Sequence, residues 1–532
     1  MQQTQYRLSL LLLTAVSAFL YWQQVAPGVL NYHEQNQLFL FTLDHLTHAL
    51  SLPGGLADYL AEAGMQLAYY PTLGALWMAI QSVLTFLLIS NLLAQLRPHY
   101  NVVSLLLTVA ITLMTCHVRW TPTLPLVLLL VLAATWLAGK SRPWMDLLLL
   151  PVLYWMVGPV AWLYAAWRIL TMGLRMVWSL PYLGLIVATA AYVLTQWPWQ
   201  VILAGIHYRT DALQSPWSAH LLAAMVLLPA IYYRWVATPK RPSLLLLPCP
   251  LALALLTLFC CPDRNEMEIL RLDMLVRHGA WEEVIHRVEH HPVPSPFTSQ
   301  CVNLALGMTG QLPHRMFELY QDGPEGLLMP MIRDNVSDLP TAEAFFQLGM
   351  INEALRYTTD LQQSILTYKR SGRCTKRMAE CHLINGNHTA AAKELQWLEQ
   401  SLFYRSWAKE NMRLVGRDNL IDQHPIYGQL RKLRFKENFL YNYHERHKIL
   451  GLLFASNTNN LLALQYHMAQ LLLNGDLNML MQSMPWVQQY GGFSQMPTTY
   501  RDALEYAQQK KSANDSPYGQ YIKRQANLSI DR

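Results

Sequence analysis

The first 261 residues of this chain contain very little charge. They hold 11 of the 40 Lys and Arg residues and 6 of the 34 Asp and Glu residues, although they make up about half of the 532 residues. This deficit excludes a purely soluble enzyme and a disordered chain, because the first half is too apolar for either. The net charge of +6 lies almost wholly in the apolar half. There it indicates membrane topology, which argues against nucleic acid as a partner.

Cysteine is also scarce, and common signatures of catalytic sites are missing. Seven Cys at irregular positions are too few for a disulfide scaffold. Cys374 and Cys381 would lie about 10 Å apart along a helix, beyond disulfide reach. There is no GxxxxGK[ST] phosphate loop, no HExxH motif and no Cys-x-x-Cys pair. We therefore expect free, buried thiols, no metal site and no resident cofactor.

The charge-poor half contains apolar runs of membrane-spanning length, for which roughly 20 residues are needed. The run at 8–26 follows Arg7 and carries Phe19, Tyr21 and Trp22 where a signal peptide would have small residues. We therefore interpret it as an uncleaved anchor. The other runs are 72–95, 101–117, 123–139, 144–178, 179–197, 217–236 and 244–261.

The run at 144–178 is too long for one helix, and Gly158-Pro159 interrupts it. It is either one kinked helix over 144–165 or a hairpin of two short helices. In the hairpin topology Arg119 and Arg209 are the only basic residues on the outer side of the membrane. The positive-inside rule favours this distribution. The basic residues on the cytoplasmic side are then Arg7, Arg97, Lys140, Arg142, Arg168, Arg175, Arg234, Lys240 and Arg241. We thus predict about nine membrane helices in a bacterial inner membrane and a periplasmic C-terminal domain.

The loop at 27–71 faces outward in this topology and has no Lys or Arg. The pattern of apolar residues predicts an amphipathic surface helix over 35–50 and a second short helix over 56–68. Pro53-Gly54-Gly55 separates the two helices. The titratable residues of the loop are Glu34, Asp44, Asp58, Glu62, His33, His45 and His48.

A helix–Gly–helix pattern recurs in the charged half. It is centred on Gly279, Gly310, Gly349, Gly386 and Gly475, and the first four are 31, 39 and 37 residues apart. Gly suits a left-handed residue at a helix end, and periods in the thirties indicate tetratricopeptide-like repeats. The chain is therefore predicted to be all-α, with a polytopic membrane domain over 1–261 and a degenerate helical-repeat domain over 262–508. The polar stretch 509–532 is predicted to be a disordered tail.

Outward-facing residues supply the candidate site. Glu34 directly follows the first membrane helix, and a carboxylate at the water–lipid boundary can become a useful base because low dielectric raises its pKa. The alternative is a solvated acid that caps a helix. Two later outward turns contribute candidate substrate-binding residues, Arg119, His207, Tyr208 and Arg209. The two guanidinium groups suit a phosphate ligand or, alternatively, lipid head groups.

This plan resembles the C-type integral-membrane glycosyltransferases over residues 1–261. The resemblance implies a polyprenyl-phosphate sugar donor. It also implies that Glu34 acts as the base or binds the acceptor or a metal, and that cations stabilise the phosphate leaving group. The sequence departs from that family because it lacks the common Asp-Asp or Glu-x-Asp pair and has fewer helices than the larger members. A membrane transferase followed by repeats also resembles the eukaryotic transmembrane O-mannosyltransferases in plan.

Nearly the whole chain resembles an uncharacterised family of polytopic membrane proteins common in Bacteroidota. This resemblance implies a bacterial inner membrane and brings no activity with it. The segments that carry it are Pro53-Gly54-Gly55-Leu56-Ala57-Asp58-Tyr59, Tyr70-Pro71-Thr72-Leu73-Gly74-Ala75, Asn303-Leu304-Ala305-Leu306, Leu348-Gly349-Met350-Ile351-Asn352-Glu353-Ala354 and Phe403-Tyr404-Arg405-Ser406-Trp407-Ala408.

Two classes of function follow from these patterns. The first is a lipid-phosphate-dependent glycosyltransferase-like enzyme at the outer face. The second is a non-catalytic membrane anchor whose helical repeats recruit envelope proteins. The enzyme requires Glu34, Arg119 and Arg209 to converge in one outward pocket, whereas the scaffold does not. A transporter is expected least, because the membrane helices are expected to carry almost no buried charge.

Overall fold

The computed structural model describes residues 2–96, 101–139, 141–194, 200–210, 217–236, 248–332, 334–365, 369–435, 441–509 and 516–530. The regular elements of these residues are all helices, with one isolated antiparallel bridge and no strand. Arg97, Lys140, Lys240 and Arg241 of the predicted cytoplasmic set lie outside them.

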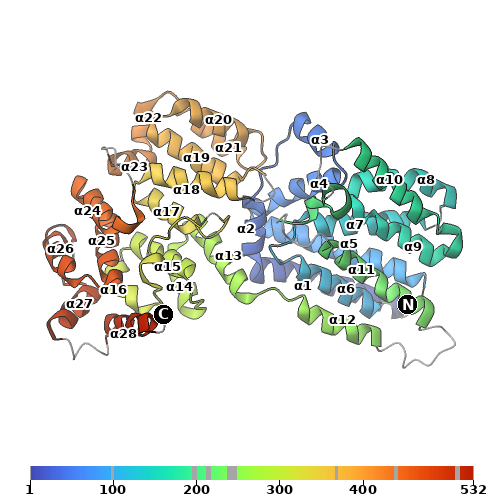
Figure 1. The fold of residues 1–532 in the computed structure, drawn as a ribbon, viewed down its shortest axis with the longest axis horizontal. Helices are drawn as coiled ribbons and strands as arrows, with labels where there is room; N and C mark the ends of the chain where they lie inside the picture. Colours follow the sequence, from blue (N-terminus) through green and yellow to red (C-terminus); the bar gives the residue numbers. More distant parts are fainter. Residues whose placement is uncertain are drawn as a thin grey trace. The chain divides into compact units, whose positions relative to one another are not determined.

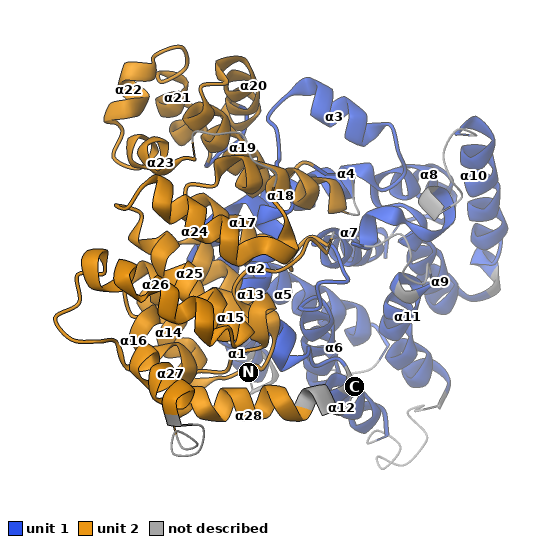
Figure 2. Cartoon of the chain, turned by 60° about the vertical axis from the view of Figure 1, so that its left-hand side comes forward, with its two compact units in different colours: residues 1–267, 366–369, 400–403 blue, residues 268–365, 370–399, 404–532 orange. Residues whose placement is uncertain are grey.

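The chain divides into two compact units (Figure 2). Unit 1 comprises Met1–Met267 together with the short segments Leu366–Lys369 and Gln400–Phe403. Unit 2 comprises Glu268–Ile365, Arg370–Glu399 and Tyr404–Arg532. The predicted boundary, after residue 261, falls six residues before this division. The two short segments of unit 1 come from the charged half of the sequence, which the sequence patterns do not indicate.

Unit 1 contains a helix in each predicted apolar run (Figure 1). Two helical spans of the described chain, Gln5–Val25 and Pro71–Ala94, are long and apolar enough to cross a membrane. Several of the other apolar helices have fewer than 18 residues, so the structure does not establish nine spans. The helices are α1 (Gln2–Leu20, continued by the π-helix η1, Tyr21–Val25), α5 (Pro71–Ala94), α6 (Asn101–Met114), α7 (Thr123–Ala138), α10 (Ser179–Val193), α11 (Ser218–Ile231) and α12 (Pro248–Phe259).

The predicted break at Gly158-Pro159 is present. Helix α8 (Asp146–Val157) ends there, and the 3₁₀ turn η4 (Pro159–Ala161) leads into α9 (Trp162–Met172). Asp146, at the start of α8, pairs with Arg168, near the end of α9, at 2.9 Å. The two ends of this segment therefore lie side by side, as in a hairpin. Both side chains are at most 2 % exposed, so the expectation of almost no buried charge is wrong.

Large apolar side chains remain exposed mainly in unit 1. Nearly all such residues in the described chain precede residue 262, and they follow the outer faces of helices such as α1, α8 and α12. Examples are Leu12, Leu148 and Leu258. Many exposed large apolar side chains in one unit are typical of protein that contacts membrane or a partner.

The loop at 27–71 forms three helices instead of the predicted two. They are α2 (Pro27–Gln35), α3 (Leu43–Leu50) and α4 (Gly55–Met65), and the 3₁₀ turn η2 (Gln66–Tyr69) follows. The single helix predicted over 35–50 is wrong because Thr42 is extended and starts α3 by accepting a hydrogen bond from the His45 amide, at 3.2 Å. The second helix lies close to its predicted range.

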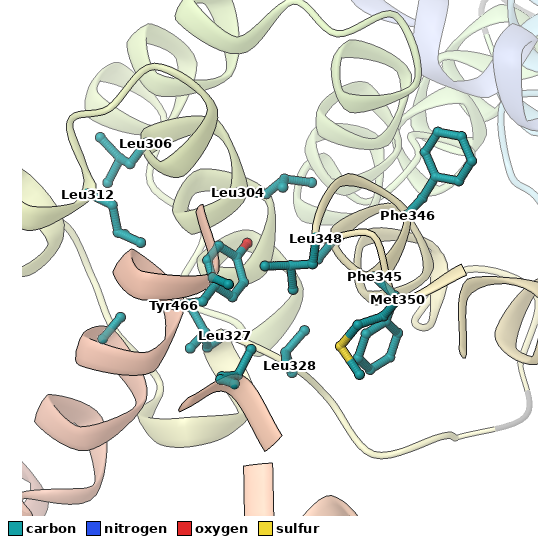
Figure 3. Close-up of a cluster of buried hydrophobic side chains, with 14 of the residues drawn as sticks. Leu304, Leu306, Leu312, Leu327, Leu328, Phe345, Phe346, Leu348, Met350 and Tyr466 are labelled. Carbon is teal, nitrogen blue, oxygen red and sulfur yellow. The ribbon is translucent and has the colours of Figure 1, made fainter. Parts of the chain in front are cut away.

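Unit 2 consists of paired helices that surround one apolar core. The helix–Gly–helix prediction is confirmed, since all five glycines lie between helices and have φ between +65° and +82°. Side chains from α15, α17 and α25 meet in the core around Tyr466 (Figure 3). The helices that flank the glycines are α13 (Arg264–Arg277), α14 (Trp281–His290), α15 (Pro296–Met308), α16 (Leu312–Arg315), α17 (Leu339–Gln347), α18 (Ile351–Ser364), α19 (Gly372–Asn385), α20 (His388–Glu399), α25 (Leu461–Asn474) and α26 (Leu477–Tyr490).

The remaining helices of unit 2 extend to the C-terminus. They are α21 (Arg405–Met412), α22 (Asp418–Gln423), α23 (Tyr427–Leu433), α24 (Arg446–Ser456), α27 (Thr498–Gln509) and α28 (Pro517–Ile530). Helix α28 contradicts the predicted disordered tail over Pro517–Ile530, whereas 510–515 and 531–532 of the predicted stretch 509–532 lie outside the described residues. Tyr518 and Tyr521 lie one turn apart and are at most 4 % exposed, and Tyr521 donates a hydrogen bond to the Leu473 carbonyl at 2.8 Å. The prediction failed because the mean hydropathy of the stretch is low, and an average does not reveal two tyrosines on one helix face.

Candidate functional site

Two carboxylates project from one face of α4 in unit 1. Asp58 and Glu62 are four residues apart, which places them on the same side of the helix. Asp58 is 7 % exposed and Glu62 is 6 % exposed. Like charges at this spacing repel each other, and burial increases the cost. A buried pair of carboxylates therefore requires positive or hydrogen-bonding partners.

Lys369 supplies the positive charge. Its ammonium lies 2.9 Å from Asp58 Oδ1 and 2.7 Å from Glu62 Oε1, so one cation bridges both carboxylates. The segment that carries Lys369 belongs to unit 1. Thr123, the first residue of α7, donates a further hydrogen bond to Asp58 Oδ1 at 2.6 Å.

A histidine accompanies each carboxylate. His207 Nδ1 lies 3.3 Å from Asp58 Oδ2, and His45 Nε2 lies 3.0 Å from Glu62 Oε2. The other ring nitrogen of His207, Nε2, is buried and has no hydrogen-bond partner among the described residues. We call Asp58, Glu62, Lys369, His45 and His207 the α4 cluster.

Electrostatics hold the central pair of the α4 cluster in its charged form. Burial raises the pKa of the Asp58 carboxyl, but Lys369, His207 and Thr123 together outweigh burial and hold that pKa well below its usual range. Burial likewise lowers the pKa of Lys369, and the two carboxylates more than compensate, so its pKa is raised. Asp58 is therefore an anion and Lys369 a cation at neutral pH.

A short extended pairing brings the predicted substrate-binding residues together. Trp120 and Arg209 form the antiparallel bridge, and the Thr210 amide donates to the Arg119 carbonyl at 3.1 Å. The Thr121 hydroxyl donates to the His207 carbonyl. Arg119, His207, Tyr208 and Arg209 thus belong to one pair of turns, and His207 joins this pair to α4.

Two glycines allow this close packing. Gly54, just before α4, has φ +86°, and Gly158 has φ +79°. A Cβ at Gly54 would lie 3.5 Å from the Gly158 Cα and from His207 Cδ2, and a Cβ at Gly158 would lie 2.6 Å from the Tyr208 hydroxyl. Tyr208 is fully buried and donates a hydrogen bond to the Val157 carbonyl. The Pro53-Gly54-Gly55 segment and the Gly158-Pro159 break therefore meet at the α4 cluster.

Glu34, the predicted catalytic acid, lies in α2 and is 3 % exposed. Helix α2 packs against α4, α5 and η2. Arg119 is exposed, whereas Arg209 is 2 % exposed. The convergence of Glu34 with the two arginines stays a prediction, and α4 is the element near which it would occur.

Sequence reasoning missed the roles of Asp58, Glu62 and Lys369. The spacing of the two acids, with Ala57, Ala61 and Gly64 around them in a charge-poor region, was a usable signal for a packed acidic helix face. Lys369 has no such signal, because 311 residues separate it from Asp58. All seven cysteines are free, and six of them are buried as predicted, but Cys261 is exposed. The described residues contain no group of three or more His, Cys, Asp or Glu side chains that could hold a metal ion.

Comparison with known proteins identifies the family but no activity. The chain matches a family of unknown function, DUF6057, over residues 3–528. No curated protein and no solved structure matches it. The chain therefore belongs to this family of unknown function.

Proposed function

We propose that the protein is a glycosyltransferase-like membrane enzyme that uses a lipid-linked phosphate donor, with His207 as its general base. The observation that carries this proposal is the Asp58–His207 pair, in which Nδ1 faces the carboxylate at 3.3 Å and the buried Nε2 has no hydrogen-bond partner among the described residues. A carboxylate on one imidazole nitrogen selects the tautomer that leaves a lone pair on the other. His207 Nε2 would thus accept the proton of an acceptor hydroxyl.

Arginine side chains would bind the departing phosphate. Arg119 and Arg209 lie on the paired turns that also carry His207, and guanidinium groups bind phosphate oxygens in a bidentate manner. A phosphate leaving group gains negative charge as its bond breaks, so nearby cations stabilise the transition state more than the ground state. Glu34 is retained as a ligand of the acceptor or as a second base.

An apolar cavity beside the site suits the lipid chain of the donor. It has a volume of about 410 Å³. The Gly54 amide, at the edge of the α4 cluster, donates to the Trp155 carbonyl at 3.0 Å and thereby links this cavity wall to the cluster. The residues that line it are Leu50, Leu56, Pro151, Val152, Trp155 and Met156.

We propose a multi-pass location in a bacterial inner membrane, with unit 2 in the periplasm. The exposed apolar faces of the unit 1 helices and the two helical spans of membrane length support this location. A reporter that is active only in the cytoplasm, fused after Arg532, should be silent. A strong signal from this reporter would place the C-terminus in the cytoplasm and would reject the proposed odd number of membrane spans.

The catalytic proposal is tested with protein in lipid nanodiscs and a polyprenyl-phosphate sugar as the probe. His207→Gln should abolish sugar transfer but keep donor binding, and Arg209→Gln should weaken donor binding. His220→Gln is the matched control, because this histidine of α11 hydrogen-bonds Trp162 and the Leu203 carbonyl away from Asp58. Donor that is neither bound nor cleaved by the wild type, or full transfer by His207→Gln, would reject the proposal.

A scaffold is the second candidate. The observation in its favour is the series of helix pairs in unit 2, joined by left-handed glycines and packed on one core. Helical arrays of this kind present surfaces for protein partners. Complementation separates the two candidates: a scaffold tolerates His207→Gln in the cell, whereas the proposed enzyme does not.

A further inference from the structure

Helix α14 of unit 2 carries two histidines four residues apart on its solvent side. His286 and His290 are both exposed, while Val284, Ile285 and Val288 are buried on the opposite side. Residues at this spacing are neighbours on a helix surface. The two imidazole rings stack with their centroids 4.2 Å apart and their planes 28° apart.

The neighbouring side chains hold this helix face in place. Arg287 pairs with Glu268 of α13 at 2.5 Å, and Glu289 pairs with Arg315 of α16. Arg287 and Glu289, the charged residues next to the two histidines, are therefore both held in ion pairs. The two rings therefore project from a helix that is fixed by its core face and by its ion pairs.

The hydrogen bond of His290 selects its free nitrogen. His290 Nδ1 lies 2.8 Å from the His286 carbonyl oxygen, so Nδ1 carries the proton and donates. The lone pair then lies on Nε2, which faces away from the backbone. An imidazole that donates one N–H to a carbonyl and offers the other nitrogen is the usual arrangement of a metal-ligating histidine.

We propose that His286 and His290 form a two-histidine site for a divalent transition metal. Imidazole pairs favour Cu²⁺, Ni²⁺ and Zn²⁺ over the hard cations Mg²⁺ and Ca²⁺, with Cu²⁺ bound most tightly. Water fills the remaining coordination positions. The proposal is independent of the catalytic proposal, because it concerns a different unit and different residues.

The test uses the full-length protein without an affinity tag, and Cu²⁺ alone as the probe. A competing chelator measures Cu²⁺ affinity, and electron paramagnetic resonance reports the nitrogen ligands. We expect one site with two nitrogen ligands that excess Mg²⁺ does not displace. His286→Gln and His290→Gln each remove one of the two ligands, so each should weaken Cu²⁺ binding by at least the roughly tenfold that loss of an outer-shell partner alone costs.

His278→Gln is the matched control. His278 is also exposed and also bonds the carbonyl four residues before it, Met274, at 2.7 Å, but it has no histidine one turn away. The His278→Gln variant should therefore bind Cu²⁺ with the same affinity as the wild type. Unchanged affinity in both pair variants, or an equal loss in His278→Gln, would overturn the proposal.

Discussion

Units 1 and 2 differ in how much charge they contain. Unit 1 has few charged residues, and of the six acids before residue 262, Glu34, Asp58, Glu62 and Asp146 are buried. Unit 2 has many, and pairs such as Lys448–Glu445 lie at its surface, with side chains 57 % and 48 % exposed. Apolar side chains show the reverse pattern, since most of the exposed ones are in unit 1.

The difference shows which charged residues are informative about structure and function. A surface ion pair in water contributes little to stability and is easily replaced. A buried charge in an apolar unit is costly unless partners compensate for it, so its retention points to structure or chemistry that needs it. The α4 cluster and the Asp146–Arg168 pair are such positions, and the following predictions are directed at this contrast.

The largest effect is expected from loss of the bridging cation. Lys369→Met leaves Asp58 and Glu62 buried without their shared partner, and should destabilise unit 1 by about 3–5 kcal/mol. Denaturant unfolding in detergent, followed by circular dichroism, measures the change. The surface variant Lys448→Met should leave unfolding unchanged.

A charge-free triple variant sharpens this result. Lys369→Met combined with Asp58→Asn and Glu62→Gln removes the uncompensated charges, so it should regain most of the lost stability. If the triple variant is as unstable as Lys369→Met alone, packing and not charge explains the loss.

Acid should destabilise unit 1 through His33. Burial lowers the pKa of His33 to about 4, whereas the unfolded chain has a pKa of about 6.5. The unfolded state therefore binds more protons between these values, and stability is full above pH about 6.5 and falls as pH drops to about 4. The loss should be on the order of 3 kcal/mol.

His33→Gln tests this assignment, since it removes the titrating ring. Unfolding measured from pH 7 to pH 4 should lose most of its pH dependence over that range in the variant. An unchanged slope would assign the acid sensitivity to other groups.

Two left-handed glycines should differ because of their surroundings. Gly310→Ala in unit 2 meets open space at φ +72°, so it should cost only the backbone strain, about 1 kcal/mol. Gly158→Ala in unit 1 adds a clash with the Tyr208 hydroxyl at 2.6 Å and should cost at least about 2 kcal/mol. Equal losses of unfolding free energy in the two variants would show that the turn at Gly158 relaxes and does not rigidly support the site.

The smallest effect concerns one hydroxyl. Thr123→Val removes the 2.6 Å hydrogen bond to the Asp58 anion and should cost about 1.5–2 kcal/mol. Thr358→Val in unit 2 removes a 2.7 Å bond to the Ala354 carbonyl within one helix, and should cost less, about 0.5–1 kcal/mol. The same unfolding assay compares them, and a larger loss in the unit 2 variant would contradict the charged role of Asp58.

Local patterns predicted much of the helical structure. The apolar runs, the break at Gly158-Pro159 and the five glycines between helices all depend on neighbours within a few turns, which the sequence displays directly. The failures were also local. The helix over 35–50 was interrupted by the Thr42 cap, and the disordered tail was contradicted by two tyrosines that pack into the core.

The candidate site was predictable only in part. Four polar residues could be named because such residues are conspicuous in the turns between apolar runs: Arg119, His207, Tyr208 and Arg209. The partners of His207 could not be predicted, because the sequence around a carboxylate does not indicate which imidazole will lie next to it in the folded chain. Asp58 was visible in the sequence, but its importance was not.

The sequence by itself determined that one half of this protein is apolar and the other charged, and that both are helical, because composition and periodicity act residue by residue. Only the tertiary structure decided which few charges meet. Lys369 reaches Asp58 and Glu62 from 311 and 307 positions along the chain, through a short segment that folds with unit 1. Such a contact depends on the packing of whole helices, and the energy that keeps it, the mutual compensation of buried charges, exists only once water has been excluded.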